Sequence, residues 1–392
     1  MKKAAVYSLV MGILALGLCF AGQKGPAGWK GTIATENGVK VVRNPAEPLY
    51  GTFAFDLEEN LAIGGDPTKE DYYFPKGAAV RPDEKGNLFV ADFGNKRVQM
   101  YDRAGRFVGT IGRQGQGPGE YQHPHAVLID ESGNLYVGGA SEIVVFGPDG
   151  TFKRKISLRT FLSRHAIGPG GTIIGTTQPS PRDGWKQQIV QADPEGITFK
   201  TIAEYVGDLA KGQKGVVLHW YSYDVGFSPL SAETFAYGFS ADYRISVADA
   251  KGEPVLAFTK DENPLPISGR EKEATRKDGY FAWYGRTYAR TENPGEDSVF
   301  PDHRPYFPTM SNAMQNDDRG RLYIIRAKSI LEREGPSAVD VFSKDGYYLY
   351  RMTWPSFPSA IKGGFLYEVR EDKETSEYQV FRYRIKNWSA MK

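Results

Sequence analysis

The sequence predicts an all-β protein, a six-bladed β-propeller whose ring is closed by an N-terminal strand that joins the C-terminal blade, with one short helical insertion. Three observations lead to this prediction. Aromatic residues and glycines are abundant, with 23 Tyr, 22 Phe and 45 Gly in 392 residues, which favours strands joined by tight turns. Residues 86–112 hold three short apolar runs separated by turn residues, as in a β-meander. This pattern recurs at a spacing of about 45 residues, which is typical of propeller blades.

Residues 1–22 have the layout of a secretory signal peptide, with a basic start followed by an uncharged apolar stretch. The only cysteine, Cys19, ends the segment Leu16-Gly17-Leu18-Cys19, which resembles a bacterial lipobox and makes Cys19 a candidate for lipidation. Cleavage after Ala21 is the alternative. We therefore expect an exported bacterial protein, either periplasmic, extracellular or anchored to the outer membrane, and without a disulfide.

Residues 23–48 read as an extended lead-in, and residues 49–388 form the propeller. Alternating apolar residues at 49–57 predict a strand that has no earlier partner. The repeats then follow at about residues 74–112, 123–158, 164–205, 221–259, 320–352 and 358–386. Because the last repeat lacks its outer strand, we expect strand 49–57 to complete it and to leave no free sheet edge in the ring.

Residues 262–305, between the fourth and fifth blades, interrupt the repeats. Ser268-Gly269-Arg270-Glu271 is a capping box, which marks the start of a helix. The residues up to Arg290 predict one moderately long helix or two short ones. We expect the aromatic residues of this insertion either to pack on the propeller or to form a lid or partner surface. The candidate surface residues are Trp283, Tyr284 and Tyr288.

Three segments carry a family resemblance, namely residues 86–92, 95–98 and above all 112–121, and Asn44-Pro45 precedes the first strand. With these features the chain resembles a family of exported bacterial six-bladed β-propellers with NHL-like repeats. The resemblance spans about residues 36–386 and implies the propeller fold. It implies little about activity, because the family is largely without an assigned reaction.

The innermost strands of a propeller line its central channel, so residues at their starts converge on one channel mouth. Aligning the repeats by their glycine turns puts His125 and His165 at two such starts, with Asp224 and Asn312 at about the equivalent places in later blades. We predict that these four residues bind a ligand. A divalent metal, Ca²⁺ or Zn²⁺, would be held by His125 and His165 if it binds, and a metal with an open position activates water. A water-filled entrance is the alternative.

The sequence favours a binding or scaffold module that recognises a protein, a glycan or a small ligand on one face. A metal-dependent lyase or hydrolase with its site at the channel mouth is the alternative, although no Gly-x-Ser-x-Gly motif is present and no catalytic residue is assigned. The 49 basic and 47 acidic residues nearly balance, so we expect no nucleic-acid partner. We expect a monomer, attached to a membrane only through a lipidated Cys19.

Overall fold

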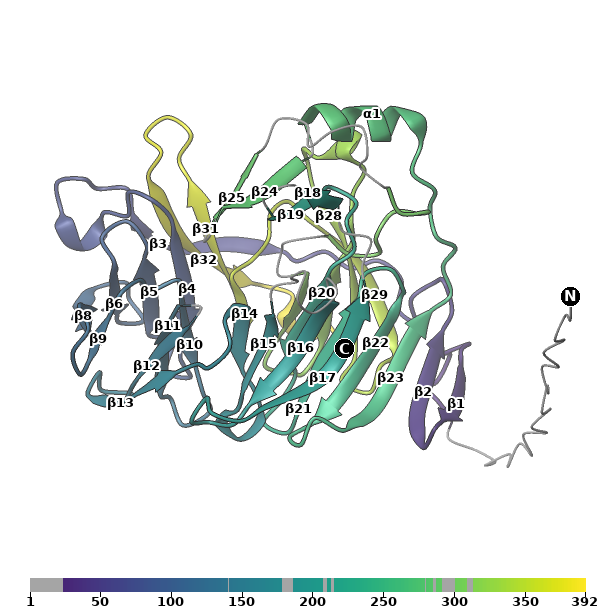
Figure 1. The fold of residues 1–392 in the computed structure, drawn as a ribbon, viewed down its shortest axis with the longest axis horizontal. Coiled ribbons are helices and arrows are strands. Elements are labelled where there is room, and N and C mark those ends of the chain that lie inside the picture. The colour runs from purple at the N-terminus through teal and green to yellow at the C-terminus, as the bar shows by residue number, and fades with distance from the viewer. Residues whose placement is uncertain are drawn as a thin grey trace, which may run out of the picture.

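The computed structural model describes residues 24–139, 141–177, 186–206, 210–212, 215–278, 280–284, 287–290, 300–308 and 313–392. The predicted signal peptide, with Cys19, lies outside these residues. The described chain forms six blades of antiparallel strands around a central axis (Figure 1), which confirms the predicted fold class.

The first three blades follow one another along the chain. Blade 1 contains β4 (Ala78–Pro82), β5 (Leu88–Asp92), β6 (Arg97–Tyr101) and β7 (Phe107–Ile111). Blade 2 contains β10 (Ala126–Ile129), β11 (Leu135–Gly138), β12 (Glu142–Phe146) and β13 (Phe152–Ser157). Blade 3 contains β14 (Leu162–Ile167), β15 (Ile173–Thr177), β16 (Lys186–Ala192) and β17 (Phe199–Val206).

The remaining blades have the same order of strands, innermost first. Blade 4 contains β20 (Val225–Pro229), β21 (Thr234–Phe239), β22 (Arg244–Asp249) and β23 (Pro254–Lys260). Blade 5 contains β26 (Met314–Asn316), β27 (Leu322–Ile325), β28 (Ser337–Phe342) and β29 (Tyr348–Trp354). Blade 6 contains β30 (Ala360–Lys362), β31 (Phe365–Glu371), β32 (Tyr378–Ile385) and β3 (Leu57–Gly64).

Short elements lie between the blades, within them or after them. The strands β8 (Arg113–Gln114) and β9 (Glu120–Tyr121) form a two-stranded sheet between blades 1 and 2. The 3-10 turns are η1 (Glu70–Tyr72), η2 (Pro169–Gly171), η4 (Ile330–Glu332) and η5 (Trp388–Ala390).

An Asp-to-Gly turn explains why the repeats fold as hairpins. In blade 1 a carboxylate oxygen of Asp102 accepts hydrogen bonds from the backbone N–H groups of Ala104 (2.8 Å) and Arg106 (3.0 Å). Gly105 has a φ of 80°, a conformation that costs glycine little. The same pairing occurs elsewhere in the turns Asp83/Gly86, Asp130/Gly133, Asp249/Gly252 and Asp317/Gly320. Each turn reverses the chain and presents the next strand to its neighbour.

An N-terminal strand closes the ring, as predicted, but its boundaries differ from the prediction. β3 (Leu57–Gly64) pairs antiparallel with β32, and Ile63 lies opposite Val380. The predicted strand 49–57 instead runs beside β29 of blade 5, where the N–H of Tyr50 donates to the carbonyl of Leu349. Its alternating apolar side chains pack against the core of blade 5. The alternating pattern correctly indicated a strand with one buried face. The prediction placed this strand in blade 6, whereas it lies beside blade 5.

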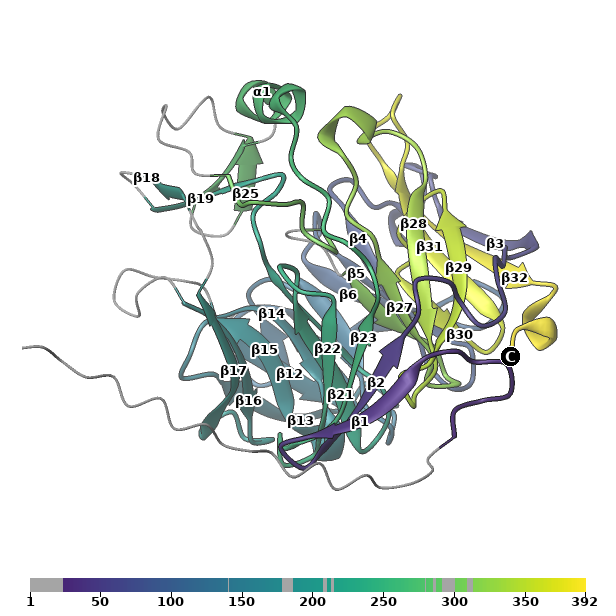
Figure 2. The ribbon, with the colours of Figure 1, turned by 90° about the vertical axis from the view of Figure 1, so that its right-hand side faces the viewer.

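The lead-in is a β-hairpin and part of a blade, and not only an extended segment. β1 (Thr32–Glu36) pairs with β2 (Val39–Asn44), and β2 pairs in parallel with β23 of blade 4 (Figure 2). Blade 4 is thereby extended to a sheet of six strands. The N-terminal region thus contacts blades 4, 5 and 6 in succession.

Asn44, at the end of β2, joins the lead-in to two blades and is 2% exposed. Its amide donates to the carbonyls of Thr259 (3.0 Å) and Gly346 (2.8 Å), and its oxygen accepts from the N–H of Tyr348 (2.8 Å). We expect Asn44→Ala to lower the free energy of unfolding by about 2 kcal/mol, because these buried groups lose their partner. Urea denaturation measures this. Lys30→Ala, at an exposed position of the same lead-in, is the control, and equal stability of the two variants would contradict the assigned role.

The insertion folds differently from the one moderately long helix, or two short helices, expected up to Arg290. α1 (Gly269–Asp278) is ten residues long and starts at the predicted capping box, in which Ser268 Oγ accepts from the Glu271 N–H and Glu271 Oε2 accepts from the Ser268 N–H. β24 (Tyr280–Tyr284) and β25 (Thr287–Arg290) follow and form a sheet with β18 (Ala210–Gly212) and β19 (Gly215–His219). This sheet and α1 lie at one end of the ring (Figures 1 and 2).

Candidate functional site

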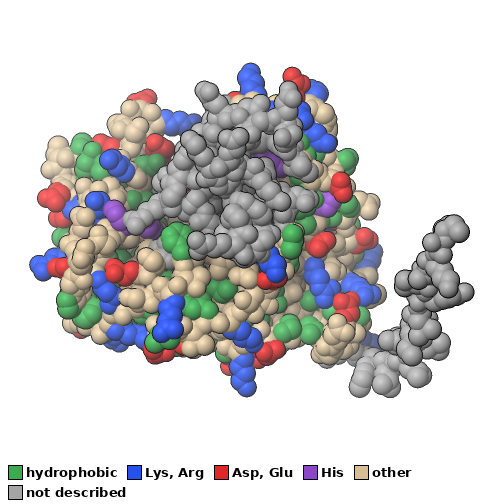
Figure 3. Space-filling view, in the orientation of Figure 1, with side chains coloured by type: hydrophobic (Ala, Val, Ile, Leu, Met, Phe, Trp, Pro, Cys, Tyr) green, Lys and Arg blue, Asp and Glu red, His purple; other side chains and the backbone are tan. Residues whose placement is uncertain are grey.

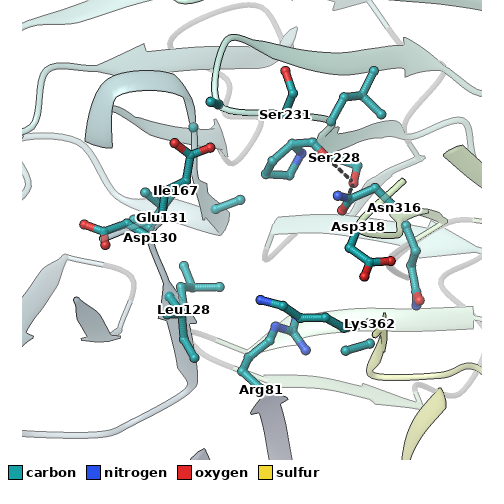
Figure 4. Close-up of a pocket in the computed structure, with 18 of the residues that line it drawn as sticks. Arg81, Leu128, Asp130, Glu131, Ile167, Ser228, Ser231, Asn316, Asp318 and Lys362 are labelled. Carbon is teal, nitrogen blue, oxygen red and sulfur yellow. Dashed lines mark hydrogen bonds between the residues drawn. The ribbon is translucent and has the colours of Figure 1, made fainter. Parts of the chain in front are cut away.

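A pocket of about 1040 Å³ occupies the central channel. Its walls include residues from the innermost strand of every blade, namely β4, β10, β14, β20, β26 and β30. Figure 4 shows side chains from these strands pointing into a shared space. The ring thus brings together residues that lie far apart in the sequence.

The pocket lies toward the end of the ring that is opposite the insertion. The four strands of a blade alternate in direction, so the innermost strand ends where the fourth strand begins. The insertion follows the end of β23, the fourth strand of its blade. The pocket is lined mainly by the last residues of the innermost strands and by the turns after them, such as Asp130–Ser132 and Pro229–Ala232. These turns lie at the other end of the ring.

Two basic side chains from neighbouring blades reach into the pocket, Arg81 of β4 and Lys362 of β30 (Figure 4). Arg81 Nη1 donates to the carbonyls of Val80 (2.9 Å) and Ser359 (2.5 Å), which ties blade 1 to blade 6. Burial lowers the pKa of the Arg81 guanidinium, because the surrounding protein solvates its charge less well than water does. Lys362 Nζ lies 2.7 Å from a carboxylate oxygen of Glu84.

Two acidic side chains of the lining, Asp130 and Asp318, already accept hydrogen bonds from groups in or near the turns around the pocket. Asp130 accepts from the N–H of Asn134 (2.8 Å) and from the hydroxyl of Tyr136 (3.1 Å). Asp318 accepts from the N–H of Gly363 (2.9 Å). These carboxylates therefore stabilise the hairpin turns around the pocket.

Uncharged polar and apolar groups complete the wall. Ser228 Oγ donates to the side-chain oxygen of Asn316 at 3.2 Å, which links blades 4 and 5 across the lining. Leu128 and Ile167 present apolar surface on the side of blades 2 and 3 (Figure 4). Apolar walls with a few placed polar and charged groups are characteristic of sites for small molecules.

The structure brings two of the predicted ligand residues, His125 and His165, near each other. Burial lowers the pKa of His165 to about 4, and the charge of nearby His125 contributes to this as the smaller cause. His165 is therefore neutral at neutral pH. His165 lines the pocket, and its Nε2 is buried without a hydrogen-bond partner in the described part of the chain. The ring of His125 stacks on that of His123, with centroids 5.8 Å apart.

His165 lies further into its strand than the sequence alignment placed it. It is opposite Gly175 in its hairpin, just as Val127 is opposite Val137 in blade 2. His165 therefore matches Val127 and not His125. The position of His165 follows from the hairpin register, counted back from the turn between β14 and β15. The register of β14 is also irregular between Leu162 and Arg164.

The other predicted ligand residues are placed differently. Asp224 forms an ion pair with Arg164, whose Nη2 lies 3.0 Å from its carboxylate, and Asp224 is not part of the pocket lining. Asn312 lies outside the described residues. In the ranges that the structure describes, no group of three or more His, Cys, Asp or Glu side chains is placed to hold a metal ion. A metal-dependent reaction stays a prediction.

Trp283, Tyr284 and Tyr288, the candidate surface residues of the insertion, belong to β24 and β25. Trp283 pairs with Tyr288 in the register of this hairpin. Their side chains lie outside the described part of the structure. Their role as a partner surface stays a prediction.

Sequence reasoning missed Arg81 and Lys362 as site residues. Their signal was present, because each is a basic residue within or at the end of an innermost strand in an otherwise mostly apolar run. The prediction looked at the starts of these strands. The pocket is built around their ends.

The molecular surface carries mixed charge. Outside the grey atoms in Figure 3, acidic and basic side chains are interspersed over the visible face. Among the described residues, no helix has both the length and the apolar character that crossing a membrane requires.

Comparisons with known structures support the architecture. A Bacteroides fragilis protein, provisionally described as exported, has a TM-score of 0.51 at 14% sequence identity, covering 88% of this chain and 99% of that chain. A member of the DUF4221 family from Bacteroides vulgatus has a TM-score of 0.50 at 13% identity, covering 84% and 98%. A gluconolactonase from Xanthomonas campestris reaches only 0.37 at 13% identity, covering 87% and 98%, and a likeness of that degree carries no information on activity.

No curated protein sequence matches the chain. Residues 68–205, which span the first three blades, match the model of the DUF5128 family, described as a 6-bladed beta-propeller. The chain is thus similar to the DUF5128 propellers over its first three blades, and its whole described fold is that of a six-bladed β-propeller.

Proposed function

We propose that this protein is an exported binding module that holds a small polar molecule in its central channel. The observation that carries the proposal is the pocket of about 1040 Å³ to which all six innermost strands contribute. Sites for small molecules typically have volumes of roughly 300–1,000 Å³ and are built where several elements meet. The central channel of this propeller has both properties.

The chemistry of the wall favours a small molecule over a protein or an extended glycan. Arg81, Lys362, Ser228 and Asn316 converge inside the ring, from four different blades, and do not spread over a flat outer face. A buried and convergent arrangement suits a compact ligand with several polar groups. The proposal assigns no reaction to the channel.

The predicted export supports a role in the cell envelope or outside the cell. The predicted leader at residues 1–22 and the similar Bacteroides fragilis protein, provisionally described as exported, both point in this direction. We infer that the protein acts there as a monomer without a nucleic-acid partner. A lipid on Cys19 would be its attachment to the membrane.

Filling the channel tests the proposal. We expect Leu128→Trp to abolish retention of the small molecule that co-purifies with the wild-type protein, because the larger ring occupies the space between the blades. Mass spectrometry of extracts from the purified proteins measures retention, and circular dichroism verifies folding. Val108→Trp is the matched control, since Val108 is 57% exposed on β7, outside the channel.

Two results would overturn the proposal. In the first, the wild-type protein carries no small molecule after exposure to extracts of its own cells. In the second, a folded Leu128→Trp variant retains the molecule as well as the wild-type protein and Val108→Trp do.

A further inference from the structure

We propose that the central channel selects molecules that carry an oxyanion, a carboxylate or a phosphate, and that Arg81 and Lys362 bind this group. The inference rests on the proposed function, because it names the class of ligand for the same pocket. Two observations support it. Arg81 has no carboxylate partner among the described residues, and Lys362 has only an exposed one.

Arg81 is a cation of the inner wall that has no carboxylate partner among the described residues. Both of its recorded hydrogen bonds use Nη1 and end on backbone carbonyls, those of Val80 and Ser359. Among the described residues no carboxylate lies within ion-pair distance of its guanidinium, and Nε and Nη2 have no hydrogen-bond partner there. A guanidinium presents five N–H donors in a planar fork that matches the two oxygens of a carboxylate or phosphate.

Lys362 supplies a second positive charge from the neighbouring blade. Its side chain is 27% exposed, whereas its partner Glu84 is 81% exposed. An ion pair with so exposed a carboxylate contributes little stability, and the exposed partner is free to move away. A ligand oxyanion in the pocket would therefore compete well with Glu84 for Lys362. Figure 4 shows Lys362 and Arg81 reaching into the same part of the pocket.

Three other basic side chains of the lining have partners of their own. Arg164 pairs with Asp224 at 3.0 Å, and Arg154 pairs with Glu195 at 3.4 Å. Arg319 donates to the carbonyl of Met391 at 3.1 Å and lies over the ring of Trp388. Lys344, the remaining basic residue of the lining, is exposed at the rim, so the positive charge inside the pocket is concentrated at Arg81 and Lys362.

Neutral polar groups on another side of the pocket suit hydroxyl groups of the same ligand. Ser228 and Asn316 are hydrogen-bonded to each other and line the wall contributed by blades 4 and 5. Each retains hydrogen-bonding capacity beyond that contact. A hydroxylated acid of the size of a sugar acid therefore matches both walls.

Anion titration tests the inference. We expect glucuronate or inorganic phosphate to bind the full-length mature protein saturably in chloride buffer at constant ionic strength, and neutral glucose to bind more weakly. Arg81→Gln should weaken anion binding by about tenfold, because a charge-assisted bidentate contact is lost. Lys362→Gln should weaken it less. Lys373→Gln, an exposed cation in the turn after β31 and outside the pocket lining, is the matched control and should bind like the wild type.

The test separates ligand binding from a structural role of Arg81. A purely structural Arg81, joining blades 1 and 6 through Ser359, predicts a lower melting temperature for Arg81→Gln with unchanged anion affinity, and that result overturns the inference. If Arg81→Gln does not fold, Lys362→Gln decides, and unchanged affinity in that variant overturns the inference. Failure of both anions to bind the wild-type protein also overturns it.

Failure of the anion assignment can be distinguished from failure of the channel as the binding site. A co-purified molecule that is uncharged, lost in Leu128→Trp and retained in Arg81→Gln would refute the anion assignment and leave channel binding intact. Retention of the molecule in Leu128→Trp would refute the channel as the site.

Discussion

Replacing Asp340 by alanine should lower the free energy of unfolding by about 3–5 kcal/mol, because Lys260 and Arg326 would lose their buried counter-charge and keep only the more exposed Glu262 as an ion-pair partner. Asp340 is 1% exposed in β28. Its Oδ2 lies 2.8 Å from Lys260 Nζ and 3.3 Å from Arg326 Nη1. The side chain joins blade 4, through Lys260, to blade 5. Urea denaturation followed by tryptophan fluorescence measures the loss.

Two tyrosines complete the environment of Asp340. The hydroxyls of Tyr243 (2.7 Å) and Tyr348 (2.5 Å) donate to its two carboxylate oxygens. Burial raises the pKa of the Asp340 carboxyl, but the charges of Arg326 and Lys260 and these hydrogen bonds outweigh it and leave that pKa below its ordinary value. The carboxylate is therefore ionised at neutral pH.

Two further variants decide whether charge pairing is the cause. Asp345→Ala removes an exposed aspartate from the next turn and should leave stability within about 0.5 kcal/mol of the wild type. Adding Lys260→Met to Asp340→Ala should recover part of the loss, since it removes a buried charge that Asp340→Ala leaves with only Glu262 as a partner. A double variant as unstable as the sum of its single variants would contradict the assigned pairing.

The second large effect is expected at Glu271, which docks α1 onto the ring. Glu271 is 1% exposed, and its Oε1 accepts from the hydroxyls of Tyr221 (2.6 Å) and Ser329 (2.7 Å) and lies 2.9 Å from Arg304 Nη2. Glu271→Ala should release α1 from blade 5, because several buried donors lose their acceptor. Faster amide hydrogen exchange across residues 269–278 measures this release. Glu273→Ala, exposed on the same helix, should exchange like the wild type.

Glu271 also predicts a dependence of this docking on pH. Burial raises its pKa, but the hydrogen bonds from Tyr221, Ser329 and Ser268 outweigh burial and lower the pKa from 4.5 to about 2. Because the folded-state pKa is the lower one, the stabilisation is fully present above about pH 4.5 and is lost as the pH falls toward 2. The protection factors of the α1 amides, which correct for the pH dependence of intrinsic exchange, should therefore fall over this acidic range in the wild type and not in Glu271→Gln. Unchanged protection factors between about pH 5 and about pH 3, roughly the upper part of that range, would contradict the assignment.

These two carboxylates explain how the parts of the molecule are held together. Asp340 joins neighbouring blades within the ring, and Glu271 holds the insertion at the end of the ring away from the pocket. Neither lines the pocket. Variants at Asp340 and Glu271 should therefore alter stability or docking, whereas variants at Arg81 and Leu128 should alter binding.

The repeats made the fold predictable because local residues determine each hairpin. Asp102 and Gly105 form a turn from contacts within a few residues, and the same spacing recurs along the chain. The capping box at Ser268 and Glu271 likewise depends on neighbours in sequence, and α1 begins there. Patterns of this kind carry their own geometry.

Elements that depend on distant partners were placed less well. Apolar residues 49–55 contact blade 5, while Leu57–Gly64, with its exposed acidic residues, completes blade 6. An alternating pattern shows that one face of a strand is buried but does not identify the sheet that covers it. The predicted helix after Asp278 is a strand because β19, from a distant segment, supplies its hydrogen-bond partner.

The amino-acid sequence by itself determined the six-bladed ring and the start of the inserted helix, since each follows from short-range turn and strand chemistry. It also indicated closure by an N-terminal strand, because the last repeat lacks its outer strand, but the bounds of that strand depend on its distant partner β32. Only the tertiary structure decided where a ligand would bind. Arg81 and Lys362 are 281 positions apart in the numbering (362 − 81), and they share one pocket because ring closure places blade 6 beside blade 1. Pairing of charges across blades depends on that closure, and no local pattern records it.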